Sequence, residues 1–189
     1  MKVVVQSLTN RQLDAFQDHL VRIYRDAFSV FPYFEEDAEV EDFARSLPLH
    51  VESEGFRIVV ALRDPSEQVV GFAYGLANTT DQFWYKRVAK AVEPWVLTEW
   101  LRGSFRLVEM AVTPEAQGQG IGGLLHDHLL IGLSYRKAVL STLAAETSAY
   151  WMYLKRGWRV LLDDYFFPGV ARPYRIMGLE LGGGEDNEP

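Results

Sequence analysis

The sequence contains no cysteine, which excludes disulfide bonds, thiolate metal sites and a cysteine nucleophile. It has no run of about 18 apolar residues, the length that a membrane-spanning helix needs. Its first residues, 1–6, are too few and too interrupted by polar side chains for a signal peptide. Basic residues are in the minority, and the net charge is −7. These absences predict a cytoplasmic protein that binds neither nucleic acid nor a membrane.

The chain of 189 residues, 48% of them hydrophobic, is long enough for one domain with a single core. No internal repeat and no linker rich in Gly, Pro or Ser divides it. Residues 182–189 are rich in glycine and then acidic, which is typical of a disordered segment. We therefore expect a single domain over residues 1–181 and a disordered tail after it.

Hydrophobic periodicity predicts strands and helices that alternate along the chain. We expect strands over residues 3–8, 56–62, 68–76, 105–112, 138–142, 158–162 and 174–181. We expect helices over residues 10–28, 36–47, 119–136 and 146–156, with Pro48 ending the second, and one or two short helices within 78–103. Because the second half alternates strand with helix and the first half is typical of antiparallel pairing, the order predicts an α/β fold with a mixed sheet.

The segment after the strand at 105–112 is the most informative part of the chain. Four of the six residues from 118 to 123 are glycine, so few side chains surround the backbone N–H groups there. The helix that follows adds unpaired N–H groups and the positive end of its dipole, which together suit a phosphate or pyrophosphate. The alternative is that the glycines only let the helix pack closely. Four of them cost roughly 0.5–1 kcal/mol each relative to alanine, which favours a ligand.

Within this segment, Gly118-x-Gly120-x-x-Gly123 matches the dinucleotide fingerprint of Rossmann folds. The context contradicts that match, because five residues, 113–117, separate the first glycine from the strand end. The next strand also ends without the Asp or Glu that would hold a ribose. The fingerprint is therefore a poor explanation of the glycines.

A larger pattern, A-V-T-P-E-A-Q-G-Q-G-I-G over residues 111–122, resembles the cofactor motif of the GNAT superfamily of N-acetyltransferases, (Gln/Arg)-x-x-Gly-x-(Gly/Ala). Gln117, Gly120 and Gly122 occupy its three places. The segment Y-L-K-R-G-W at 153–158 is similar to the family's helix-to-strand element, Tyr-x-x-x-Gly-Phe. The resemblance covers about residues 1–181 and implies a mixed, centrally splayed sheet flanked by helices.

The resemblance implies an enzyme that transfers an acetyl group from acetyl-coenzyme A to a primary amine of a small molecule or a protein. The glycine segment would hold the pyrophosphate, and the strand before it would pair with the amides of the pantetheine arm. The expected cofactor-binding residues are Met110, Ala111, Val112, Gln117, Gly118, Gln119, Gly120, Ile121, Gly122 and Gly123.

Direct transfer needs one proton removed from the amine and one delivered to the departing thiolate. Tyr153 matches the general-acid tyrosine of the family, and the alternative is an ordinary half-buried aromatic residue. Glu109 is the candidate base, acting through water, and the alternative is a structural charge on the strand. Many family members use water relays instead of a single base. Glu146 stands where some relatives have a cofactor-contacting Asn, and it is a weaker candidate base.

The acceptor would lie against the segment between the first two helices, where Phe31, Tyr33 and Phe34 predict an aromatic wall. The alternative is a plug over the core. The aromatics at 83–85 and 95–100 fit either a substrate lid or the surface of a homodimer. We expect no metal, because His126 and His128 are two residues apart on a helix and point to different sides. His128 lies on the predicted apolar stripe and is expected to be buried.

Two other functions remain open from the sequence. One is a non-catalytic module of the same fold that senses acetyl-coenzyme A and binds a partner, which burial of Tyr153 away from the thioester would favour. The other is a nucleotide-dependent oxidoreductase, which binding of NAD(H) without coenzyme A would reveal.

Overall fold

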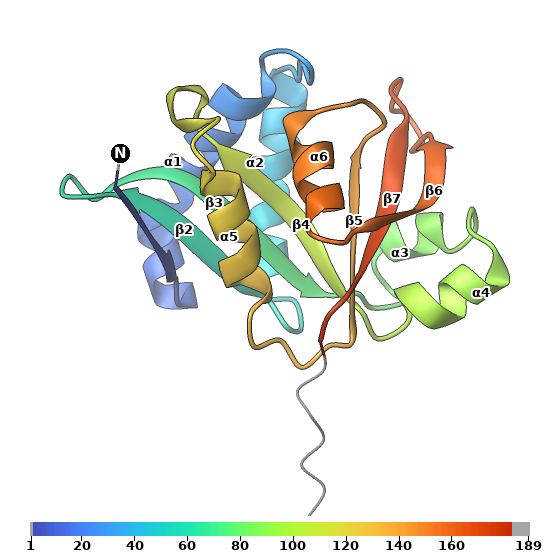
Figure 1. The fold of residues 1–189 in the computed structure, drawn as a ribbon. Coiled ribbons are helices and arrows are strands. Elements are labelled where there is room, and N and C mark those ends of the chain that lie inside the picture. Colours follow the sequence, from blue (N-terminus) through green and yellow to red (C-terminus); the bar gives the residue numbers. More distant parts are fainter. Residues whose placement is uncertain (1, 183–189) are drawn as a thin grey trace, which may run out of the picture. The chain divides into compact units, whose positions relative to one another are not determined.

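The computed structural model describes residues 2–182 (Figure 1), so the predicted tail lies, from residue 183 on, outside the described residues. The strands are β1 (Val3–Ser7), β2 (Arg57–Arg63), β3 (Gln68–Ala77), β4 (Phe105–Val112), β5 (Lys137–Leu143), β6 (Arg159–Tyr165) and β7 (Tyr174–Glu180). The helices are α1 (Asn10–Phe28), α2 (Asp37–Val51), α3 (Phe83–Val88), α4 (Pro94–Val96), α5 (Ile121–Leu130) and α6 (Ser148–Lys155). A π-helical turn, Leu97–Leu101, follows α4, and a 3₁₀ turn, Pro114–Ala116, precedes α5.

The strands form one open mixed sheet in the order β1-β2-β3-β4-β5-β7-β6, which confirms the predicted α/β class. Backbone contacts group the chain into two compact units. The first contains residues up to Leu76 and Val108–Ile131, and the second contains Ala77–Leu107 and the residues from Gly132 on. The single domain over residues 1–181 stays a prediction.

The first unit contains β1, β2, β3 and the second half of β4. The pairs β1–β2 and β2–β3 are antiparallel, with Val5 opposite Ala61 and Val60 opposite Phe72. Helices α1 and α2 cover one face of these strands and α5 covers the other (Figure 1). The core between the sheet and α1 and α2 includes Leu20, Phe43, Leu47, Val60, Phe72 and Tyr74. This packing fixes the strand end from which the glycine segment leaves.

The second unit contains the start of β4, then β5, β7 and β6. β4 and β5 are parallel, β5 and β7 antiparallel, and β7 and β6 antiparallel. The aromatic segment 78–103 forms α3, α4 and the π-helical turn, whose buried Trp84 and Trp100 pack with Val139 of β5 and Ile176 of β7. These aromatics therefore make a second core.

Two predicted helix ends were wrong. Pro48 lies inside α2, which continues to Val51 because Leu47 is buried in the core and Val51 packs against it. The proline removes one hydrogen bond to the carbonyl of Ala44, and the burial of Leu47 offsets that loss. The helix expected to reach residue 136 ends at Leu130, and Gly132 follows with a φ of 71° in the left-handed region.

Candidate functional site

The glycine segment forms the connection between β4 and α5, within the first unit. Thr113 N–H donates a hydrogen bond of 2.9 Å to the carbonyl of Val70 on β3. This bond attaches the start of the segment to the sheet. The 3₁₀ turn buries Ala116 completely. Gly118 and Gly120 then adopt φ values of 72° and 80°, a left-handed conformation that costs other residues about 1–2 kcal/mol. Two of the four glycines are thus required by the backbone itself.

This backbone path leaves a row of donors without acceptors. The first hydrogen bond of α5 runs from Leu124 N–H to the carbonyl of Gly120, at 3.1 Å. Within the described residues, none of the six N–H groups from Gly118 to Gly123 donates to a backbone carbonyl. A Cβ built on Gly118 or Gly120 would meet no atom within 4 Å, so open space lies beside them. Unpaired donors at the positive end of a helix are what an anion such as pyrophosphate binds.

The two glutamines of the motif brace the connection. The Gln117 side-chain amide donates a hydrogen bond of 3.0 Å to the carbonyl of Val112. The Gln119 side-chain amide donates one of 3.2 Å to the carbonyl of Glu115. Each side-chain amide thus donates one hydrogen bond to the protein's own backbone. A cofactor contact from either residue stays a prediction.

Gly71 also supports the anion seat, as we call the backbone of residues 118–123, and no sequence motif pointed to it. A Cβ at Gly71 of β3 would lie 2.9 Å from the carbonyl oxygen of Ala111 and 3.1 Å from Leu125 Cδ1. The missing side chain lets α5 approach the sheet closely at the level of β4. The only signal in the sequence was glycine inside a strand, which often marks a place where another backbone segment approaches closely.

Strand β4 carries Glu109, Met110, Ala111 and Val112 towards the seat. Among the described residues, β4 pairs with β5 at only two positions, Phe105 with Ala138 and Arg106 with Val139. Ala111 is buried, and Glu109, Met110 and Val112 are half-buried. Their contacts with a thioester arm stay predictions.

Tyr153 belongs to α6, in the second unit. The helix begins after Thr147, whose hydroxyl oxygen accepts a hydrogen bond of 3.0 Å from Tyr150 N–H, a standard N-cap. The ring of Tyr153 packs against Trp158 with its centroid 5.6 Å away, and Tyr153 is only 5% exposed. The tyrosine is therefore held in one orientation within its unit. Its role as an acid stays a prediction.

The predicted aromatic wall lies on the segment between α1 and α2. Phe31 and Phe34 are 78% and 63% exposed, and their rings meet edge to face with centroids 6.0 Å apart. Tyr33 is half-buried and packs on Phe28 instead. Two of the three residues thus present aromatic surface to solvent and do not plug the core.

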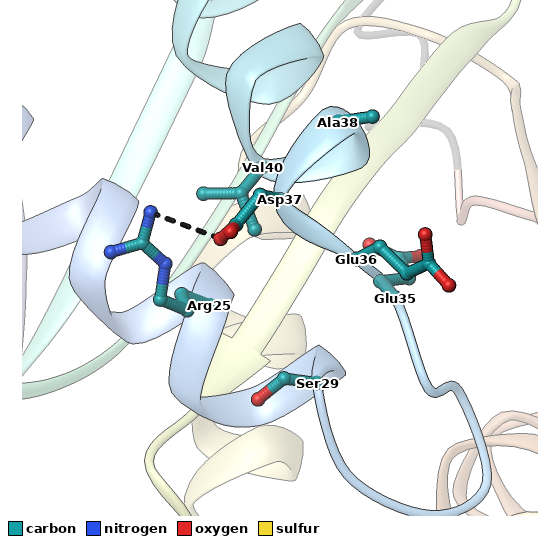
Figure 2. Close-up of a pocket in the computed structure, with 7 residues that line it drawn as sticks. All are labelled: Arg25, Ser29, Glu35, Glu36, Asp37, Ala38 and Val40. Carbon is teal, nitrogen blue, oxygen red and sulfur yellow. Dashed lines mark ion pairs between the residues drawn. The ribbon is translucent and has the colours of Figure 1, made fainter.

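A pocket of about 520 Å³ lies beside this wall (Figure 2). It is lined by Arg25, Ser29, Glu35, Glu36, Asp37, Ala38 and Val40. Arg25 and Asp37 are 3.7 Å apart across it, and the hydroxyl of Tyr24 donates 2.6 Å to Glu35. The run of three acidic residues was visible in the sequence, but the pocket depends on how the two helices meet.

The prediction that His128 of α5 is buried was wrong. His126 is buried at 4% exposure, with Nδ1 2.8 Å from Asp127 Oδ1, whereas His128 is exposed. The buried arc of α5 is centred on Leu125 and Leu129, and at 100° per residue His128 falls beyond its edge. Within residues 2–182, no group of three His, Asp or Glu side chains is arranged to hold a metal ion.

The comparisons with known proteins define the class. Residues 54–160 match the family model of the acetyltransferase (GNAT) domain. This match covers more than half of the chain, from β2 to β6, and includes the whole glycine segment. The chain belongs to the GNAT acetyltransferase family. No helix in the described part of the chain is both long and apolar enough to cross a membrane.

Individual relatives agree with this class. The GCN5-like protein acetyltransferase Rv2170 of Mycobacterium tuberculosis is 27% identical over 121 residues, which are 60% of this chain and 59% of that protein. The chain thus spans about three fifths of the length of that curated relative. The ribosomal-protein-S18-alanine N-acetyltransferase of Escherichia coli has a similar fold, with 18% identity, a TM-score of 0.63 and coverage of 100% and 99% of the two chains. A phosphinothricin acetyltransferase of Sinorhizobium meliloti in complex with acetyl-coenzyme A has 21% identity, a TM-score of 0.63 and coverage of 100% and 94%.

Proposed function

We propose that this protein is an N-acetyltransferase that moves an acetyl group from acetyl-coenzyme A directly to a primary amine of a small molecule or a protein. The observation that carries the proposal is the row of six unpaired N–H groups from Gly118 to Gly123 at the start of α5. A pyrophosphate offers the negatively charged oxygens that such a row binds. The fold neighbour from S. meliloti holds acetyl-coenzyme A, which agrees with this ligand.

The bound thioester would supply the activated acetyl group. Met110, Ala111 and Val112 of β4 would pair with the amides of the pantetheine arm, since the ladder to β5 ends after Arg106. The amine nitrogen would form a bond to the carbonyl carbon, and the carbon–sulfur bond would break with its electron pair on sulfur. A backbone N–H of this strand would stabilise the negative charge on the carbonyl oxygen.

Two protons must move in this transfer. We assign delivery of a proton to the departing thiolate to Tyr153, because a phenolate and a thiolate have comparable basicity. Glu109, acting through water, would accept the proton that the amine loses. A general acid contributes about 10²–10⁴-fold to a rate, so we expect Tyr153→Phe to lower kcat by about 10²-fold.

Acceptor binding is assigned to the segment with Phe31, Tyr33 and Phe34. The exposed rings of Phe31 and Phe34 provide an apolar surface, and the neighbouring pocket carries three carboxylates and one arginine. A cationic amine with an apolar or aromatic body fits both features. The cytoplasmic location and a homodimer remain predictions from the sequence.

The low exposure of Tyr153 favours a second candidate, a module of the same fold that binds acetyl-coenzyme A without turnover. Thiol release from acetyl-coenzyme A, measured against polyamines, aminoglycosides, amino acids and peptide N-termini, separates the two candidates. We expect release with at least one amine class. Tight binding of acetyl-coenzyme A without release for any amine would support the sensing module instead.

Calorimetric titration tests the cofactor independently of turnover. We expect acetyl-coenzyme A and coenzyme A to bind and NAD(H) to show no heat of binding. Binding of NAD(H) without coenzyme A would overturn the proposal and would favour a nucleotide-dependent oxidoreductase.

A further inference from the structure

An arginine of β7 holds the connection between β5 and α6. Arg175 Nη1 donates 3.1 Å to the carbonyl oxygen of Ala145, two residues before the N-cap of α6. Its guanidinium carbon lies 4.2 Å from the centroid of the Tyr150 ring, on the first turn of the helix. Its Nε donates 3.0 Å to Asp163 Oδ1 of β6. One side chain thus ties two strands to the beginning of α6.

These contacts matter because α6 is short. It has eight residues, about two turns, and Tyr153 lies three residues after Tyr150, on the same side of the helix. The far end is held separately, by Trp158 N–H donating 3.2 Å to the carbonyl of Tyr153 and by the contact between the two rings. Both ends of the helix are thus anchored, and the anchors of the first turn set the direction of the two-turn helix that carries Tyr153.

The chemistry of the anchor is specific to arginine. The Arg175 side chain is 16% exposed, whereas its partner Asp163 is half exposed, so the charge is largely covered by the protein on the side of the carbonyl and the ring. A planar guanidinium donates in two directions and stacks on an aromatic face at the same time. A lysine ammonium can keep the carboxylate or the carbonyl, but it cannot reproduce all three contacts.

We infer that Arg175 is a positioning residue for the reaction: it orients the Tyr153 phenol by fixing Ala145 and Tyr150 at the start of α6. The inference rests on the proposed function, in which Tyr153 delivers a proton. Arg175 touches neither the thioester nor the amine in this assignment. Small misplacement of a catalytic group is enough to lower a rate strongly, since about 1 Å costs up to 10²-fold.

A double-mutant cycle on the full chain tests this inference. Wild type, Arg175→Met, Tyr153→Phe and the double variant are compared by thiol release at saturating amine. We expect Arg175→Met to lower kcat about tenfold, with the KM for acetyl-coenzyme A changed less than twofold. In the Tyr153→Phe background the same change has no further effect on kcat, because the group it orients is gone. Arg175→Lys restores part of kcat.

Arg159→Met is the matched control. Arg159 also lies over an aromatic ring in the second unit, 5.2 Å from the centroid of Trp100, and its ion-pair partner is Glu180 of β7. We expect its kcat to stay within twofold of wild type. If Arg175→Met does not fold, Tyr150→Leu, which removes only the aromatic partner of Arg175, replaces it in the double-mutant cycle with Tyr153→Phe.

The outcomes separate the inference from the proposed function. Additive losses in the cycle, or equal losses for Arg175→Met and Arg159→Met, would mean a merely structural role and would overturn the inference alone. An unchanged kcat in Tyr153→Phe would remove the acid role of Tyr153 and the inference with it. Absence of thiol release by wild type would overturn the proposed function first.

Discussion

The side-chain amide of Gln117 donates a hydrogen bond of 3.0 Å to the carbonyl oxygen of Val112. Val112 is the last residue of β4, so the bond joins the strand end to the residue before the first glycine. It closes the loop that contains the 3₁₀ turn. The glutamine of the family motif thus shapes the loop, while the glycines keep their N–H groups unpaired.

We predict that Gln117→Ala weakens acetyl-coenzyme A binding without unfolding the protein. Loss of this bond costs about 1 kcal/mol, which corresponds to a Kd about fivefold higher. Calorimetric titration measures it, and Gln68→Ala, on the exposed start of β3, is the control with an expected unchanged Kd. Equal Kd values for wild type and Gln117→Ala would show that the brace has no part in binding.

A second prediction compares two glycines with the same backbone conformation. Gly120 and Gly132 have φ values of 80° and 71°, and a Cβ on either meets nothing within 4 Å. Alanine at each position costs about 1–2 kcal/mol of stability through the left-handed backbone alone. We expect similar falls in Tm for Gly120→Ala and Gly132→Ala, but a Kd for acetyl-coenzyme A at least tenfold higher only in Gly120→Ala. Matching Kd values in the two variants would argue against a ligand at Gly120.

A third prediction concerns the packing of α5 on the sheet. A methyl group at Gly71 meets the carbonyl of Ala111 at 2.9 Å, and backbone cannot move aside as easily as a side chain. Overpacking of this kind costs about 1–3 kcal/mol, so Gly71→Ala should lower the free energy of unfolding by that amount in a urea titration. Gly182→Ala, where a Cβ meets no atom within 4 Å, is the control. A Gly71→Ala variant as stable as wild type would contradict the tight fit.

A fourth prediction concerns the pKa of Asp81. The hydroxyl of Thr79 donates 2.6 Å to Asp81 Oδ1, and this bond, then the Asp81 backbone N–H and the charge of Lys86, lower the pKa of the carboxyl below its ordinary 3.8. A lowered pKa stabilises the fold above pH 3.8, and that contribution is lost as the pH falls through the folded value. We expect Thr79→Val to raise the pKa of Asp81 towards 3.8 in an NMR titration.

The control for this titration is Thr98→Val, whose hydroxyl donates to the carbonyl of Pro94 instead of to a carboxylate. The pKa of Asp81 should be the same there as in wild type. A wild-type pKa at or above 3.8 would contradict the prediction.

Local patterns predicted the elements that local forces decide. The β-branched run at 105–112 and the amphipathic pattern at 10–28 gave the observed bounds of β4 and α1. Pro48 misled the prediction, because the core contacts of Leu47 and Val51 outweigh one missing hydrogen bond. The assignment of His128 to the core also failed, since the neighbours of α5 decide which arc of the helix is covered.

By itself, the sequence located the glycine segment, because four glycines between a strand and a helix leave backbone N–H groups that few side chains cover. It also indicated the family, since the motif and its place in the strand order are local features. Only the tertiary structure decided that Gly71 admits α5 to the sheet, that Gln117 and Gln119 face carbonyls of the protein, and that Arg175 holds the start of α6. The contacts of Gly71 and Arg175 join residues far apart in the sequence, so packing chooses their partners. The two glutamines bond carbonyls four and five residues earlier, and the path of the loop decides which carbonyl each one faces.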